Sequence, residues 1–358
     1  MSLLHIFLVV VVLALLIAFH EFGHFICAKS VGVPVKIFSI GFPLGPKPLL
    51  SFKWGETDVQ LNALPLGGFC AFMDDENSKD EDGNDYSPGD KRFLKNRKLW
   101  ERTLIISGGV VANMIVAYAI LLGLVSFTGV PDLSKSTGVV VNQVIPDTPA
   151  AAAGFQNGDQ ITRIEGTTIA NVDGMQKVVK SRTGESITVE VKRLDSTLTL
   201  TPIPTAEGTI GVQIQNLLYK RPVSGPAEAF SRAGEDLVNM TKMLAGALVR
   251  LVSGALPLNQ VGGLVEVVHM GSKVSQTGFT ELMYFAALIS VELAILNILP
   301  IPALDGGHLM LLLIEGLRGK PLPRRIEENL HYAGFVLLMG LGVFLIFKDV
   351  FGLAFGKG

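Results

Sequence analysis

The stretch 3–27, LLHIFLVVVVLALLIAFHEFGHFIC, is an apolar run long enough to cross a membrane, and it carries His20, Glu21 and His24 near its end. His20 and His24 are four residues apart, so a helix places both imidazoles on one face with Glu21 beside them. Ionisable side chains are costly in hydrocarbon unless they face protein or water. The stretch therefore predicts a retained membrane-spanning helix that carries a functional site.

The spacing His-x-x-x-His with a glutamate after the first histidine is typical of helical zinc sites. In such sites the histidines bind the metal and the glutamate takes a proton from water. We therefore expect Zn²⁺ at His20 and His24, with Glu21 as general base. Three protein ligands leave a fourth position for water. From residue type alone, Asp305 and His308 are both candidates for the third ligand.

Composition favours a membrane protein. Apolar residues make up 49% of the 358 residues, and the mean hydropathy of +0.44 arises from discrete apolar runs. The net charge of −2 comes with Lys and Arg scattered in short loops, so no nucleic-acid partner is expected. Cys27 and Cys70 are too few for a zinc ribbon or a disulfide framework. We expect a multi-span α-helical protein whose surroundings are a lipid bilayer.

About four transmembrane helices are predicted, at 1–28, 103–130, 279–317 and 329–355. Cations following the first segment and those at 318–325 fall on one side of the membrane, which the positive-inside rule assigns to the cytoplasm. The small residues at 107–109 and Asn113 in the second segment predict close helix packing with a hydrogen bond across the contact. Two prolines and two glycines at 300–307 must open the third helix.

The segment 29–102 is expected to form a cytoplasmic or membrane-dipping β-loop, an acidic loop and a surface helix. Prolines exclude a long helix early in it, while 49–54 and 57–64 have the composition of short strands. Residues 74–90 are acidic and rich in Gly and Asn, which favours a flexible loop. Residues 93–102 mix apolar and basic side chains, a pattern typical of a helix at the membrane surface.

Residues 135–206 have the composition of a soluble domain. They contain the string PAAAAGFQNGDQI at 149–161, which resembles a PDZ domain. The resemblance implies an inserted α+β module that adds a peptide strand to an open groove beside a helix. That groove is expected either to hold a peptide ligand or to exclude bulky substrate ectodomains. An amphipathic helical linker and a re-entrant loop are predicted to follow at 207–278.

The first-span motif, the string NILPIPALDGGH at 297–308 and the PDZ-like module between them together resemble the site-2 protease family of intramembrane zinc metalloproteases. Within that family the chain is similar to the bacterial regulator-of-sigma-E type with a single PDZ domain. The similarity covers nearly the whole chain, so it bears on fold and chemistry together.

The resemblance implies roles for individual residues. It favours Asp305 over His308 as third zinc ligand, makes Asn297 a residue that steadies the substrate backbone, and relates the strand at Gly67 and Gly68 to a membrane-dipping β-loop that contacts substrate. A transmembrane helix keeps its backbone hydrogen bonds internal and offers no extended carbonyl. We therefore expect a strand edge within 57–70 to hold an unwound substrate.

The resemblance also implies a substrate and a location. The expected substrate is a single-span membrane protein already trimmed by another protease, such as an anti-sigma factor or a remnant signal peptide. The expected location is a bacterial inner membrane, or a thylakoid in a photosynthetic source, with the PDZ module outside and the active site towards the cytoplasm. Two alternatives remain: an inactive PDZ scaffold, and a metal transporter, which should carry polar groups in several spans.

Overall fold

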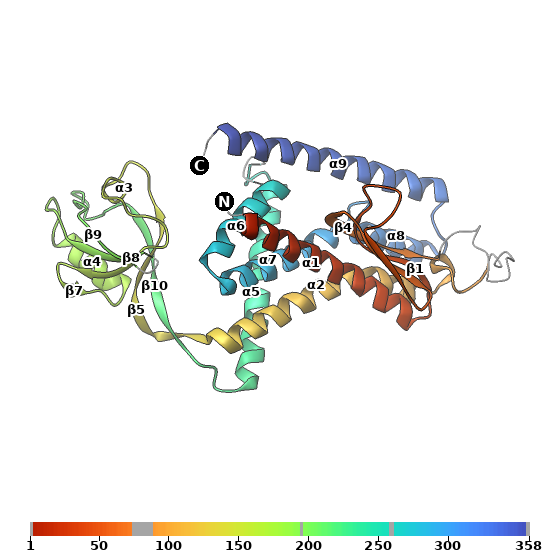
Figure 1. Cartoon of the computed structure of the whole chain (residues 1–358), viewed down its shortest axis with the longest axis horizontal. Helices are drawn as coiled ribbons and strands as arrows, with labels where there is room; N and C mark the ends of the chain where they lie inside the picture. The colour runs from red at the N-terminus through yellow and green to blue at the C-terminus, as the bar shows by residue number, and fades with distance from the viewer. Residues whose placement is uncertain (1–2, 74–88, 194–195, 258–260, 356–358) are drawn as a thin grey trace. The chain divides into compact units, whose positions relative to one another are not determined.

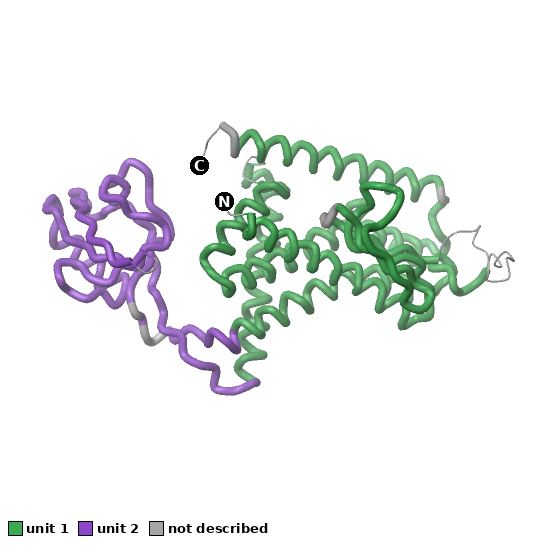
Figure 2. The backbone as a smooth tube through the Cα atoms, viewed as in Figure 1, with its two compact units in different colours: residues 1–124, 227–358 green, residues 125–226 purple. Residues whose placement is uncertain are grey.

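The computed structural model describes residues 3–73, 89–193, 196–257 and 261–355 (Figure 1). The chain forms two compact units, one of residues 1–124 and 227–358 and the other of residues 125–226 (Figure 2). Within these described ranges, four helices have the length and apolar composition to cross a membrane. They are α1 (Leu3–Ser30), α2 (Leu99–Thr128), α7 (Phe279–Asn297) and α9 (Arg324–Phe355). The four predicted apolar segments correspond to these helices, with shifts of a few residues at most boundaries.

The third predicted span is interrupted as expected: α7 ends at Asn297, and α8 (Asp305–Arg318) begins after a tight turn. Ala303 in that turn has a φ of 80°, which a non-glycine residue rarely adopts. A Cβ atom on Gly306 would lie 2.2 Å from the carbonyl oxygens of Ile298 and Leu299. The turn therefore packs its own backbone closely and places Asp305 at the start of a new helix.

Four strands form a sheet whose outer strand packs against α1. Its strand order is β2-β3-β1-β4, with β1 and β3 parallel and the other pairs antiparallel. The predicted strands at 49–54 and 57–64 correspond to the second and third, and the strand that the resemblance implied at Gly67 and Gly68 is the fourth. The first was not predicted. The strands are β1 (Val35–Phe42), β2 (Leu50–Trp54), β3 (Thr57–Leu61) and β4 (Leu64–Phe72).

The strand order determines which strand has an unpaired edge that could pair with a substrate. Because β3 is paired on both sides, residues 57–61 offer no free edge. Of the predicted interval 57–70, only the part in β4 lies at an edge of the sheet. Strand β4 pairs with β1 through contacts such as Phe38 with Cys70, and it also packs against α1.

Two expectations about connecting segments were wrong. The predicted surface helix at 93–102 is a single 3-10 turn, η1 (Leu94–Asn96), followed by the start of α2. The predicted re-entrant loop is a helix, α6 (Leu264–Thr277), whose Gly271 packs against Phe285 and Val9 instead of breaking the chain. The amphipathic helix was correctly predicted and is α5 (Pro226–Val252). Most of the acidic stretch, 74–88, lies outside the described residues.

The second unit is an α+β module with strand order β10-β5-β6-β8-β9, and β7 pairs with β6. It extends beyond the predicted limits of 135 and 206 because β10 completes the sheet by pairing with β5. Edge strand β10 contacts α4, and Asn216 Oδ1 accepts a hydrogen bond from the Val172 N–H. The elements are β5 (Val130–Val144), α3 (Pro149–Ala152), β6 (Gln160–Ile164), β7 (Thr167–Thr168), α4 (Val172–Lys180), β8 (Val189–Arg193), β9 (Ser196–Leu200) and β10 (Val212–Arg221).

Candidate active site

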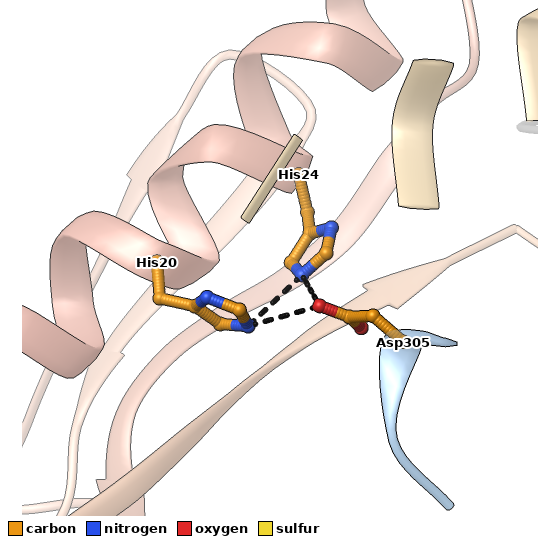
Figure 3. A group of neighbouring side chains, drawn as sticks. All are labelled: His20, His24 and Asp305. Atoms are coloured by element: carbon orange, nitrogen blue, oxygen red, sulfur yellow. Dashed lines mark hydrogen bonds and ion pairs between the residues drawn. The ribbon is translucent and has the colours of Figure 1, made fainter. Parts of the chain in front are cut away.

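His20 and His24 of α1 and Asp305 of α8 point towards a common position (Figure 3). Nε2 of His20 lies 3.2 Å from Oδ2 of Asp305, and Nε2 of His24 lies 3.4 Å from the same oxygen. The two Nε2 atoms are 3.3 Å apart. Both histidines are buried and Asp305 is half-buried. The structure therefore brings together the three ligands that the resemblance implied.

These three donor atoms fit a tetrahedral zinc ion. Zinc bonds of about 2.0–2.1 Å at tetrahedral angles place neighbouring ligand atoms about 3.3 Å apart, and the three observed separations agree with this spacing. Within the described part of the chain, buried Oδ2 of Asp305 accepts no hydrogen bond, although both ring nitrogens lie close to it. A carboxylate oxygen and two imidazole nitrogens that converge in this way form a site for a cation.

The second ring nitrogen, Nδ1, of each histidine also has a nearby polar partner that orients the ring. Nδ1 of His24 lies 2.9 Å from the Ile105 carbonyl oxygen, so Nδ1 carries the proton and Nε2 keeps its lone pair for the metal. Nδ1 of His20 lies 3.3 Å from Nδ2 of Asn113, whose buried Oδ1 has no partner among the described residues. Turning the amide by 180° sets Oδ1 against the Nδ1–H and satisfies both groups. Asn113 thus positions His20.

We expect Asn113→Ala to weaken zinc binding about 10- to 100-fold, because His20 loses the acceptor that fixes its tautomer and ring orientation. Asn113→Asp keeps an acceptor oxygen at this position and should restore most of the affinity. Competition with a chromophoric chelator measures the affinity, and a thermal unfolding curve shows whether the variant is folded. Wild-type zinc affinity in a folded Asn113→Ala protein would contradict the assignment.

Close packing of α1 and α2 makes this arrangement possible. A Cβ atom on Gly23 would lie 2.2 Å from the Gly108 carbonyl oxygen, so the two helices meet backbone to backbone. A Cβ atom on Gly109 would lie 2.4 Å from Nε2 of His24 and 2.5 Å from Cε1 of His20. The small residues of α2 were predicted to serve packing. Gly109 also leaves the space that both imidazole rings occupy.

Strand β4 runs beside the predicted base. The Glu21 carboxylate accepts a hydrogen bond from the Cys70 backbone N–H. A Cβ atom on Gly68 would lie 3.1 Å from Cγ of Glu21, whereas Gly67, with a φ of 114°, lies against the Phe42 ring. Burial, and secondarily the charge of Glu21, raise the pKa of Cys70, so its thiol stays protonated at neutral pH. Of the two predicted glycines, Gly68 is the one beside Glu21.

His308 belongs to a second group of side chains, with Glu327 and His331. Its ring stacks on that of His331, with centroids 4.1 Å apart. The Ala303 N–H donates to Nδ1 of His331, so the neutral His331 ring carries its proton on Nε2 and offers no lone pair there. This second group is therefore a poor metal site. The structure places His308 outside the group formed by His20, His24 and Asp305.

Asn297 is the last residue of α7, and its side-chain amide makes no hydrogen bond among the residues that the structure describes. Its amide is therefore available to a substrate. Gly109 and Asn113 were not predicted as parts of the metal centre. Their separation of four residues equals that of His20 and His24, so the two pairs lie on matching helical faces. This shared spacing is the signal in the sequence that could have revealed them.

The fold and the site define a membrane-embedded metalloprotease of the H-E-x-x-H class. Residues 8–341 match the model of Peptidase family M50. The chain belongs to this family, the site-2 proteases, and it is an integral membrane zinc metalloprotease.

Relatives extend over almost the full chain. A protein of Nostoc sp. named as a zinc metalloprotease is 41% identical over 352 residues, which cover 95% of this chain and 94% of the relative. The chloroplast membrane metalloprotease ARASP of Arabidopsis thaliana is 34% identical over 362 residues, or 97% of this chain and 79% of the relative. Among solved structures, a PDZ domain of an SdrC-like protein from Listeria monocytogenes is 27% identical, with coverage of 22% and 87% and a TM-score of 0.20.

Proposed function

We propose that this protein cleaves a peptide bond within or near the transmembrane helix of a single-span protein that another protease has already trimmed. The observation that carries the proposal is the placement of the metal group. Two of its three ligands lie on α1, a candidate membrane span, and the predicted base lies beside the outer strand of a sheet. A remnant signal peptide or a membrane-tethered anti-sigma factor has the required form.

Each side chain has a separate role in the proposed reaction. His20, His24 and Asp305 would hold a zinc ion, which when bound would act as a Lewis acid and lower the pKa of a water molecule towards neutrality. Glu21 removes the proton from the attacking water and delivers it to the leaving amine nitrogen. The amide of Asn297 donates to the substrate backbone near the scissile bond. The five side chains come from α1, α7 and α8, so the turn between α7 and α8 sets their geometry.

Substrate presentation requires an extended chain, because a helix hides its carbonyl groups. The Cys70 N–H points towards Glu21, and backbone groups alternate along a strand, so those of Gly68 and Phe72 also point away from β1. We propose that an unwound substrate segment pairs with this edge of β4. Gly68 has no side chain and leaves room for the substrate next to the base.

We expect Phe72→Pro to reduce cleavage about tenfold or more, because proline removes an edge N–H from β4. Zinc content should not change. Lys53→Pro is the matched control: Lys53 lies on the opposite edge strand, where the two-residue hairpin loop turns its N–H away from β3. That variant should stay within about twofold of wild type. Equal rates for both variants in a peptide-release assay would remove the β4 edge from substrate binding.

We propose that residues 125–226 face the extracytoplasmic side of a bacterial inner membrane or the corresponding side of a thylakoid membrane. The cations after the first span and at 318–325 support this orientation, because the positive-inside rule assigns their side of the membrane to the cytoplasm. The chloroplast location in the name of one relative fits the thylakoid alternative. The open edge of β10 beside α4 is the proposed groove for a peptide or a trimmed ectodomain.

The proposed function is tested with tagged single-span substrates in detergent, with and without their ectodomains. Cleavage of the shortened form, lost with a zinc chelator and restored by zinc, is the expected result. Absence of zinc-dependent cleavage for several shortened substrates would contradict the proposal.

A further inference from the structure

A groove of about 310 Å³ lies beside α1, one to two turns before Glu21. Helices α1, α6, α7 and α9 contribute its walls. Most of its lining side chains are aliphatic, among them Leu13, Ile17, Val267 and Ile289. Glu292 of α7 is the one ionisable side chain among the described residues that line it. The groove therefore has an apolar surface with a single polar group.

Within the described residues, no polar contact offsets the cost of placing the Glu292 carboxyl group in an apolar groove. Within the described part of the chain, its carboxyl makes no hydrogen bond or ion pair, and no charged neighbour acts on it. The residue is half-buried and lies in a helix with the length and composition of a membrane span. An ionisable side chain without a partner at this depth is costly, and such residues mark sites that bind a ligand.

The groove is continuous with the proposed substrate path. Ile17 lines the groove, and a Cβ atom on Gly68 would lie 3.5 Å from Cγ2 of Ile17 and 3.1 Å from Cγ of Glu21. A substrate segment paired with β4 at Gly68 thus has its neighbouring residues at the groove. The volume is at the small end for binding pockets, so it admits one or two side chains and not a helix.

The chemistry of the groove identifies the side chain that it fits. An apolar wall disfavours a charged carboxylate, and a neutral carboxyl group both donates and accepts a hydrogen bond. A primary amide does the same with matching geometry, so the two groups form a pair of parallel hydrogen bonds. We propose that Glu292 is a specificity-determining residue that selects substrates with Asn or Gln in the transmembrane segment near the cleaved bond. This inference rests on the proposed proteolytic function.

Cleavage kinetics test the proposal with a set of substrates that differ at one transmembrane position, which carries Asn, Leu or Lys in turn. The expected result is a kcat/KM for the best-placed Asn substrate roughly three- to tenfold above that of its Leu counterpart. Glu292→Leu should remove this preference, and Glu292→Gln should retain it. Glu281→Leu, at an exposed position of the same helix, is the matched control and should behave like wild type. Equal rates for Asn and Leu at every position, a stronger preference for Lys, or an unchanged preference in Glu292→Leu would overturn the proposal.

A binding measurement separates this proposal from the proposed function. Full-length Glu21→Gln protein is titrated with the fluorescently labelled Asn and Leu substrates, with and without the added change Glu292→Leu. Tighter binding of the Asn substrate that depends on Glu292 supports the inference even if no protein cleaves any substrate. Equal binding of both substrates in all variants contradicts the inference even if cleavage is observed.

Discussion

Glu21→Gln is expected to lower the cleavage rate on the order of 10²- to 10⁴-fold while zinc stays bound. Glutamine has the same shape and can still accept the Cys70 N–H, but it cannot take a proton from water. The three proposed ligands, His20, His24 and Asp305, are unchanged in this variant. The rate is measured with a shortened single-span substrate, and zinc content is measured by elemental analysis of the same sample.

Glu281→Gln is the control for this experiment, since Glu281 is an exposed glutamate far from α1 in sequence. It should cleave at the wild-type rate. Equal activity of Glu21→Gln and wild type would remove Glu21 from the mechanism. If neither protein cleaved any of several substrates although zinc was bound, an inactive scaffold that acts through its PDZ-like groove would become the leading hypothesis.

Gly109→Ala is expected to abolish both zinc binding and cleavage. The added Cβ would lie 2.4 Å from Nε2 of His24 and 2.7 Å from Nε2 of His20, so at least one ligand must move. Displacement of a reacting group by about 1 Å already costs about 10²-fold in rate, and here the displaced atoms are the metal ligands themselves. Zinc content after gel filtration and the cleavage rate are the two measurements.

Gly123→Ala on the same helix is the matched control, because a Cβ at position 123 meets nothing within 4 Å. It should bind zinc and cleave as wild type does, and both variants should retain the helical signal of the folded protein. Full zinc content and a wild-type rate in Gly109→Ala would show that the histidines do not occupy the positions described here.

The sequence predicted the features that depend on local properties. An apolar run can be recognised from about 20 consecutive residues, so the four candidate spans were found with small boundary errors. The assignment of His20 and His24 as metal ligands followed from helical spacing, whereas that of Asp305 required the resemblance to a family. Their convergence in one group agrees with that assignment. The break before Asp305 was predicted from two prolines and two glycines. Pro300 and Pro302 lie in the break, whereas both glycines lie within α8.

The missed features depend on contacts between distant segments. Strand β4 was expected at Gly67 and Gly68 only from the resemblance, because its sequence LPLGGFCAF lacks polar and apolar alternation. Its pairing with β1, which sets Phe72 opposite Val35, has no local signal and was missed. The Ile105 carbonyl that orients His24 is a backbone atom, which no residue type identifies. A re-entrant loop was expected where α6 lies, and Gly271 instead lets α6 approach Phe285. In each case the role of the residue depends on a contact with a segment that is distant in sequence.

The pairing of β5 with β10 has a consequence for the evolution of the chain. Val130 is opposite Arg221, and antiparallel partners lie only about 5 Å apart, so the chain leaves the helical unit and returns to it at nearly one point. For the helices, the whole intervening sequence is equivalent to a hairpin turn. An insertion with such closely spaced ends can be lengthened, duplicated or exchanged without altering the register of the helices that hold the metal. The second unit and the helical unit that holds the metal group can therefore diversify separately.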